Sequence, residues 1–192
     1  QGLKANELIG SSSADNGRTW TEPTVIPMPI AGSAEAPGPL CVTRTGRWLA
    51  CYSPYNTFDP SLAVDWSQVV VMFSDDAGST WRHVSMLRFD RPDIGAAEAW
   101  VIELSDRRLL GTCWRTPDDG SELPNEYAMS SDGGTTWTPT NSTGTMGQTT
   151  ALAPLTDGRA LFLYNQRKHG DPGVRVAVVR PSGGEKLTIG EL

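Results

Sequence analysis

The chain alternates apolar and polar residues with a period of two in several separate stretches. The clearest is Val174, Val176 and Val178, separated by Arg175 and Ala177. This period places alternate side chains on opposite faces of a β-strand, and no stretch shows the 3.6-residue period of a helix. The pattern therefore predicts an all-β protein. The predicted strands cover residues 7–13, 19–27, 39–44, 47–53, 68–74, 80–87, 98–104, 108–115, 126–131, 136–140, 149–155, 159–166, 173–180 and 185–189.

One short pattern, S-x-D-x-G-x-T-W, occurs three times, each time after a predicted strand. The copies lie at residues 13–20, 74–81 and 130–137, at intervals of roughly 60 residues. An Asp side chain can accept hydrogen bonds from its own turn, Gly permits a positive φ, and Thr-Trp suits the start of a half-buried strand. We therefore interpret these positions as structural: Asp15, Gly17, Trp20, Asp76, Gly78, Trp81, Asp132, Gly134 and Trp137.

Short strands that repeat at this period predict a β-propeller with about four strands per blade. We predict a single partial domain over residues 1–192, an incomplete arc of a six-bladed ring made of four-stranded antiparallel blades. A half blade precedes three blades, with bounds 1–30, 31–90, 91–142 and 143–192. The turn at 180–187 stands where a fourth copy of the pattern would be, without its Asp, Thr and Trp.

An open arc of blades leaves unpaired strand edges at both ends. We therefore expect a piece of a longer protein, two copies that complete one ring as a homodimer, or a free-standing arc, and we favour the first. Gln1-Gly2 matches the remainder of a cleaved affinity tag.

Composition and charge argue against two classes of function, nucleic-acid binding and membrane spanning. The 192 residues are 38% hydrophobic, enough for a real core, and the formal net charge is −6 with scattered basic residues, which argues against nucleic acid as the main partner. No apolar run is long enough for a membrane span, and no signal peptide is visible. The compartment stays undetermined.

The cysteines and histidines suggest no metal site. Cys41, Cys51 and Cys113 are an odd set without metal-ligand spacing, and there are only two histidines. A two-residue hairpin loop at 45–46 would point Cys41 and Cys51 to opposite faces of the sheet. We therefore expect free, mostly buried thiols and no metal or cofactor.

One hairpin carries a candidate charged site. A two-residue loop in it would place Glu98 directly opposite Arg115, on the face away from the three repeated turns, where the long loops lie. The equivalent residues of the fourth blade are the uncharged Thr149 and Gln166, whereas Arg175 lies at the same face of that blade. The alternative is an exposed cross-strand salt bridge worth under ~1 kcal/mol, with Arg175 as a solvated rim residue.

The three turns resemble the Asp boxes, or BNR repeats, of the sialidase (neuraminidase) superfamily of six-bladed propellers. Residues 98–115 are similar to the sialidase segment in which a Glu opens one strand and a substrate-binding arginine closes the next. Residues 173–178 resemble the strand that carries the third such arginine. The resemblance implies that Glu98 is the partner of a nucleophilic tyrosine outside this chain, and that Arg115 and Arg175 bind a sugar carboxylate.

The resemblance also implies an incomplete site. The family's first arginine and its acid/base Asp precede the first Asp box, its tyrosine follows the third arginine, and Tyr55, Tyr127 and Tyr164 stand in the wrong order to replace it. We therefore expect a hydrolase of the sialidase-like exo-glycosidase lineage, acting on terminal acidic sugars of glycans, with this chain inactive alone. The alternatives are a non-catalytic propeller that binds carbohydrate or protein, and a purely structural arc.

Overall fold

A computed structural model of the chain describes residues 4–168, 170–181 and 187–191. These residues form strands and loops, and none of them is helical. This part of the chain contains no helix of the length and apolarity that crossing a membrane requires. The prediction of an all-β protein is confirmed.

The strands are β1 (Leu8–Gly10), β2 (Thr24–Ile26), β3 (Ser33–Glu35), β4 (Cys41–Val42), β5 (Trp48–Tyr55), β6 (Gln68–Ser74), β7 (Arg82–Arg88), β8 (Ile94–Glu103), β9 (Leu109–Pro117), β10 (Glu126–Ser130), β11 (Asn141–Ser142), β12 (Gln148–Pro154), β13 (Ala160–Gln166), β14 (Gly173–Pro181) and β15 (Leu187–Glu191).

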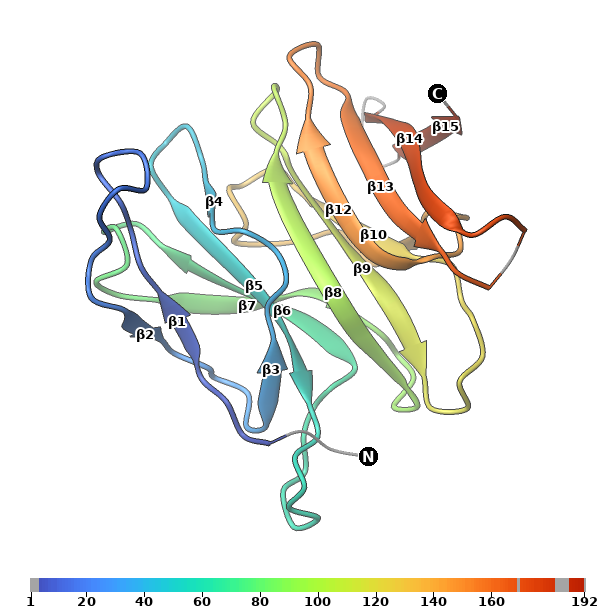
Figure 1. Cartoon of the computed structure of the whole chain (residues 1–192), viewed down its shortest axis with the longest axis horizontal. Coiled ribbons are helices and arrows are strands. Elements are labelled where there is room, and N and C mark those ends of the chain that lie inside the picture. The colour runs from blue at the N-terminus through green and yellow to red at the C-terminus, as the bar shows by residue number, and fades with distance from the viewer. Residues whose placement is uncertain (1–3, 169, 182–186, 192) are drawn as a thin grey trace.

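The strands form four antiparallel sheets that follow one another along the chain. Their orders are β1-β2, then β3-β5-β6-β7 with β4 also paired to β5, then β8-β9-β10-β11, then β12-β13-β14-β15. Figure 1 shows the sheets side by side, from the blue N-terminal pair to the red C-terminal sheet. The predicted arc of four-stranded antiparallel blades is confirmed, whereas the residue bounds of its parts stay a prediction.

Hydrophobic clusters fill the three junctions between neighbouring sheets. Leu8 and Ile26 of the first sheet pack with Tyr52 of the second, and two further clusters join the second sheet to the third and the third to the fourth. All seven residues of β6 are buried, because that sheet is covered on both faces. This burial explains why residues 69–73 of β6 are all apolar, without alternation.

The β4–β5, β8–β9 and β12–β13 hairpins, one in each full sheet, share one loop geometry. Each is closed by a backbone N–H···O bond of 2.8 Å: Thr43 to Arg47, Leu104 to Arg108 and Leu155 to Arg159. The third loop residue is left-handed in every case, with φ 87° at Gly46, 71° at Arg107 and 87° at Gly158. Three-residue loops require such a residue. The two-residue loops assumed from the sequence are therefore wrong.

The extra loop residue changes which faces the thiols share. Cys41 pairs with Leu49, so Cys41 and Cys51 lie on the same face of the sheet. The prediction of opposite faces is wrong, because a shift of one residue moves a side chain to the other face. All three cysteines are free, with Cys51 and Cys113 buried and Cys41 partly exposed, so the prediction of free, mostly buried thiols is confirmed.

Two strands differ from their predicted positions. The outer strand of the third sheet is β11, beyond the predicted 136–140, where Pro139 cannot donate to a ladder. The short β3 was not predicted. On one side it is bonded by a side chain and not by another strand: the Asn6 amide bonds the N–H and the carbonyl of Ala34 at 2.8 and 2.7 Å. Residues 182–186 of the turn at 180–187 lie outside the described residues.

The three S-x-D-x-G-x-T-W turns, called the Asp turns below, share one hydrogen-bond network. In the second, Asp76 accepts bonds from the Ser74 hydroxyl (2.8 Å) and from the N–H and hydroxyl of Thr80 (2.8 and 2.7 Å). The first and third turns repeat these contacts. Each aspartate carboxylate is therefore bonded within its own turn, as the predicted structural role requires, and that role stays a prediction.

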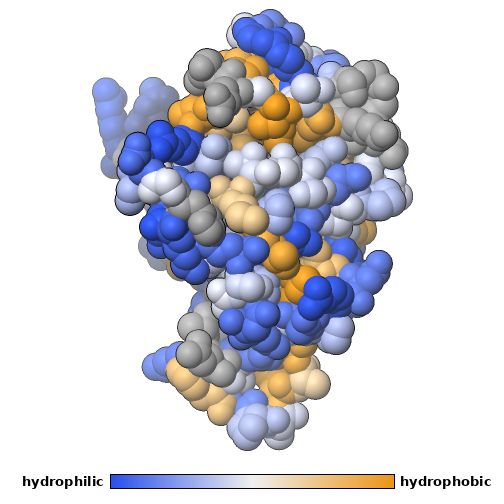
Figure 2. Space-filling view, turned by 90° about the vertical axis from the view of Figure 1, so that its right-hand side faces the viewer, coloured by the Kyte–Doolittle hydropathy of each residue, from blue (hydrophilic) through white to orange (hydrophobic). Residues whose placement is uncertain are grey.

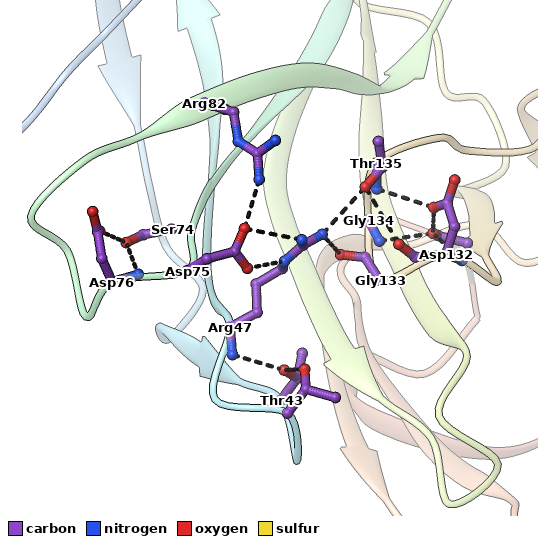
Figure 3. A network of polar contacts seen from close by, with 12 residues as sticks. Thr43, Arg47, Ser74, Asp75, Asp76, Arg82, Asp132, Gly133, Gly134 and Thr135 are labelled. Carbon is purple, nitrogen blue, oxygen red and sulfur yellow. Dashed lines mark hydrogen bonds and ion pairs between the residues drawn. The ribbon is translucent and has the colours of Figure 1, made fainter.

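The Asp turns lie on the same face as the three-residue hairpin loops at 44–46, 105–107 and 156–158. The Arg47 guanidinium bonds Asp75 at 2.6 and 3.0 Å and the Gly133 carbonyl at 2.9 Å (Figure 3). In Figure 1 the loops at 56–67 and 118–125 lie at the opposite end of the sheets. A pocket shaped by these long loops would therefore be remote from the Asp turns.

Candidate functional site

Glu98 occupies an irregular position inside a strand. The ladder between β8 and β9 shifts between Ala97 and Trp100, and Glu98 lies in this bulge with a left-handed φ of 51°. One carboxylate oxygen, Oε2, is buried and has no hydrogen-bond partner among the described residues. Bulges and left-handed non-glycine residues cluster at functional sites, where they re-aim a side chain.

Glu98 has a second carboxyl group beside it. Glu35 of β3 accepts a bond from the Glu98 N–H at 3.1 Å, and the Tyr55 hydroxyl lies 3.5 Å from the same Glu35 oxygen. Burial raises the pKa of Glu35, and the Glu98 charge adds to this, while the two hydrogen bonds oppose it. The cluster of Glu35, Tyr55 and Glu98 is called the carboxyl site below, and burial is the largest of the effects on the pKa of Glu35 in it.

Tyr55 is a hydrogen-bond donor in this cluster. Its burial raises the pKa of the phenol well above the ordinary value, and the charges of Glu35 and Glu98 raise it further. Ser53 lies opposite Glu35 in the β3–β5 ladder, and its buried hydroxyl has no partner among the described residues. Buried polar groups are normally bonded, so the carboxyl site retains unused bonding capacity at Ser53 and Glu98.

Arg115 does not face Glu98. It pairs with Ala96 in the ladder, because the three-residue loop and the bulge each shift the register by one residue. Its guanidinium bonds Glu126 at 2.9 Å and the Pro124 carbonyl at 3.0 Å. Burial raises the pKa of Glu126 and the charge of Arg115 opposes this. The predicted cross-strand pair of Glu98 and Arg115 is wrong.

The ion pair of Arg115 and Glu126 borders a crevice between the second and third sheets. The cavity has a volume of about 670 Å³, and Phe89 and Trp137 supply aromatic surface to its wall. Both partners of the ion pair are mostly buried. The lining of the crevice therefore combines two aromatic residues with an ion pair.

Arg175 is exposed on β14, where it pairs with Tyr164. Its guanidinium donates to the Asp171 carbonyl at 2.8 Å. The contacts of Arg175 in the described part of the chain include neither Glu98 nor Arg115. The structure therefore does not bring the three predicted site residues into one contact network.

A second bulge repeats the position of Glu98 in the next sheet. The β12–β13 ladder shifts between Gln148 and Thr150, and Thr149 lies there with φ 59°. The Thr150 hydroxyl donates to the Glu98 carbonyl at 3.0 Å, so the two bulges are directly linked. Thr149 was matched to Glu98 by its distance from the hairpin turn, and the structure gives the two residues the same bulged geometry.

Glu35 is not among the site residues predicted from the sequence, and Tyr55 is rejected there as the nucleophilic tyrosine. Glu35 stands in a short polar segment with no strand pattern, directly before Ala-Pro-Gly-Pro. Tyr55 was excluded by its order along the chain, yet it contacts Glu35 through the pairing of β3 with β5. The one local signal was an acidic residue close to a rigid Pro-Gly-Pro segment. His169 lies outside the described residues.

Comparison of the sequence with known families gives one match over nearly the whole chain. The model of a BNR repeat-like domain matches residues 1–188. No curated protein matches the sequence.

Several solved structures share the fold. A protein of unknown function from Dyadobacter fermentans is 22% identical, with a TM-score of 0.72 over 92% of this chain and 51% of that one. A Hadza microbial sialidase is 17% identical, with a TM-score of 0.68 over 97% and 40%. A Penicillium chrysogenum α-L-arabinanase, solved with arabinobiose, is 18% identical, with a TM-score of 0.60 over 96% and 55%. The chain thus spans about half the length of these proteins or less.

Proposed function

The chain belongs to the family of BNR repeat-like domains, and we propose that it carries part of the sugar-binding site of a sialidase-like exo-glycosidase. The observation that carries this proposal is Glu98, held in a left-handed bulge next to a second carboxyl group with one buried oxygen unbonded. In the sialidase-like scheme Glu98 is the partner of a nucleophilic tyrosine, and Glu35 is a second carboxyl group beside it. Both carboxyl groups suit hydrogen bonds to the hydroxyl groups of a sugar, and the free oxygen of Glu98 has no competing protein partner among the described residues.

We assign the terminal sugar to the acidic class through Arg175. Its guanidinium bonds a backbone carbonyl and no carboxylate among the described residues, so its charge is available to a ligand. Arg115 would have to exchange Glu126 for a sugar carboxylate, which makes it a weaker candidate. The glycan partner is therefore one with a terminal carboxylate.

The test is calorimetric titration of the protein with 3'-sialyllactose and with arabinobiose, an acidic and a neutral sugar. We expect binding of the acidic sugar, weakened by Glu98→Gln and about tenfold or more by Arg175→Ala, since a hydrogen bond to a charged group contributes about 1.5–3 kcal/mol. Arg180→Ala, an exposed arginine on the same strand, is the matched control and leaves binding unchanged. The assignment to acidic sugars would be refuted if arabinobiose bound as tightly as 3'-sialyllactose and Arg175→Ala left that affinity unchanged. Binding of neither sugar would refute the proposed site.

We further propose that the 192-residue chain does not turn over a fluorogenic sialoside. Tyr55 keeps its proton beside two carboxyl groups, which disfavours the phenolate that a nucleophilic tyrosine needs. Any measurable turnover by the chain would contradict this statement, and its loss in Tyr55→Phe would identify Tyr55 as the nucleophile.

A second candidate function is binding of a neutral sugar without hydrolysis, in the crevice between Phe89, Trp137 and the Arg115–Glu126 pair. Aromatic faces beside fixed polar groups suit the two kinds of surface on a sugar ring. Binding of arabinobiose that survives Glu98→Gln but is lost in Arg115→Ala would favour this candidate.

A further inference from the structure

We infer that Thr149 is a second ligand-contacting residue of the carboxyl site, and that Thr150 is a positioning residue that holds the backbone of Glu98. The inference rests on the proposed function, because it concerns the same sugar. It extends the site from the third sheet to the fourth.

The first support is where the backbone strain lies. Five described non-glycine residues have positive φ, and Asn16, Ala77 and Arg107 belong to hairpin turns. Only Glu98 and Thr149 among them lie inside strands, each in a ladder shift of the first strand of its sheet. Turns need left-handed residues, but a strand does not. A repeated exception in strands therefore calls for a reason other than chain reversal.

The second support is the residue type at position 149. A β-branched side chain in the left-handed region is a true outlier, and a glycine would adopt φ 59° without this cost. Thr149 is half-buried, and its hydroxyl makes no hydrogen bond to any other described residue. Backbone strain of this kind is concentrated at active sites and ligand-binding positions. A hydroxyl without a protein partner suits a bond to a sugar hydroxyl.

The third support is the connection between the two bulges. The Thr150 hydroxyl lies 3.0 Å from the Glu98 carbonyl and 3.1 Å from the Thr112 hydroxyl, and both threonines are buried. This short chain of bonds joins β9 and β12 to the bulge of β8. The neighbour of Thr149 therefore sets the backbone position from which the Glu98 carboxylate projects.

The test of Thr149 compares thermal stability with affinity for 3'-sialyllactose. Thr149→Gly removes the strain and the hydroxyl, so we expect Tm to rise by about 2–4 °C while binding weakens by roughly three- to tenfold. Thr149→Ser keeps the hydroxyl and should retain most of the affinity. Ala77→Gly relieves the same kind of strain in an Asp turn, and should raise Tm without changing binding.

Two outcomes would overturn the role of Thr149. One is unchanged affinity in Thr149→Gly while Glu98→Gln weakens binding, which leaves the proposed function standing. The other is a fall in Tm for Thr149→Gly, which shows that the residue is not strained. If the wild-type protein binds no 3'-sialyllactose, the proposed function fails and this inference fails with it.

The test of Thr150 uses the pH dependence of sugar binding. Thr150→Val removes the donor to the Glu98 carbonyl, and Thr112→Val removes the next hydroxyl of the same buried network. Both should lower Tm, but only Thr150→Val should move the pH midpoint of binding, because it displaces the Glu98 backbone and with it the N–H that bonds Glu35. Equal midpoints in the two variants would show that Thr150 serves packing alone.

Discussion

Arg47 donates a hydrogen bond of 2.9 Å to the carbonyl of Gly133, and so connects the β4–β5 hairpin of the second sheet to the Asp turn of the third (Figure 3). The equivalent arginines of the other two hairpins bind an aspartate within their own loop. The second hairpin has Thr45 in place of that aspartate. Arg47 therefore reaches Asp75 and the neighbouring sheet instead.

Loss of this connection should destabilise the protein. The Arg47 side chain is 18% exposed and makes several charge-assisted bonds, so Arg47→Ala should lower the free energy of unfolding by about 1–3 kcal/mol. Arg82 shares Asp75 and the Phe73 ring but is 64% exposed, so Arg82→Ala should cost under about 1 kcal/mol. Urea unfolding measures both, and equal losses would contradict a specific role for the contact with Gly133.

The Asp turns should make the protein sensitive to acid. Bonds from Thr19 lower the pKa of Asp15 to about 2, and bonds from Thr80 lower that of Asp76 to about 2. These folded pKa values lie below the unfolded value of about 3.9, so the carboxylates stabilise the fold above about pH 4 and the contribution is lost as the pH falls toward 2. Tm measured against pH should fall across this window.

A variant isolates one of these carboxylates. Asp76→Asn should lower Tm at pH 7 and flatten its decline below pH 4, because one titrating group has been removed from the network. Asp90→Asn replaces an aspartate outside the Asp turns and should leave both the value and the slope near wild type. An unchanged acid slope in Asp76→Asn would show that the turn carboxylate does not drive the loss.

The thiols should be unreactive in the folded protein. Burial raises the pKa of Cys41 to about 11 and of Cys51 to about 12, and it raises that of Cys113 further. Thiolate is the reactive form, so titration with Ellman's reagent at pH 8 should proceed slowly until urea exposes all 3 cysteines. Prompt modification of the native protein, retained in Cys41→Ser, would mean that one of the buried thiols is accessible.

Apolar surface at the two ends of the arc should drive self-association. Ile9 and Val25 are paired and exposed on the first sheet, and Val174 is 67% exposed on the last. Figure 2 faces the C-terminal side and shows apolar patches among polar residues. We predict a molar mass that rises with concentration in light scattering, consistent with two arcs sharing a ring. The double variant Ile9→Lys with Val174→Lys should be monomeric, and a wild-type monomer at all concentrations would contradict the prediction.

The sequence by itself determined the all-β class, the positions of the three Asp turns and the order of the sheets along the chain. Each depends on residues close together in the chain: the period of two, the side-chain bonds of Asp76 to Thr80, and the Gly that accepts a positive φ. Local chemistry of this kind is recorded directly in the sequence. The family resemblance rested on the same turns, and the match over residues 1–188 agrees with it.

Only the tertiary structure decided which side chains meet at Glu98. The loop with the left-handed Arg107 and the bulge at Glu98 each shift the register of the ladder by one residue. Arg115 consequently does not face Glu98, and it forms its ion pair with Glu126. Glu35 contacts Glu98 from a different sheet, 63 residues away along the chain, and Tyr55 in turn bonds Glu35. Register and contacts between sheets depend on the free energy of packing the whole arc, which no local pattern records.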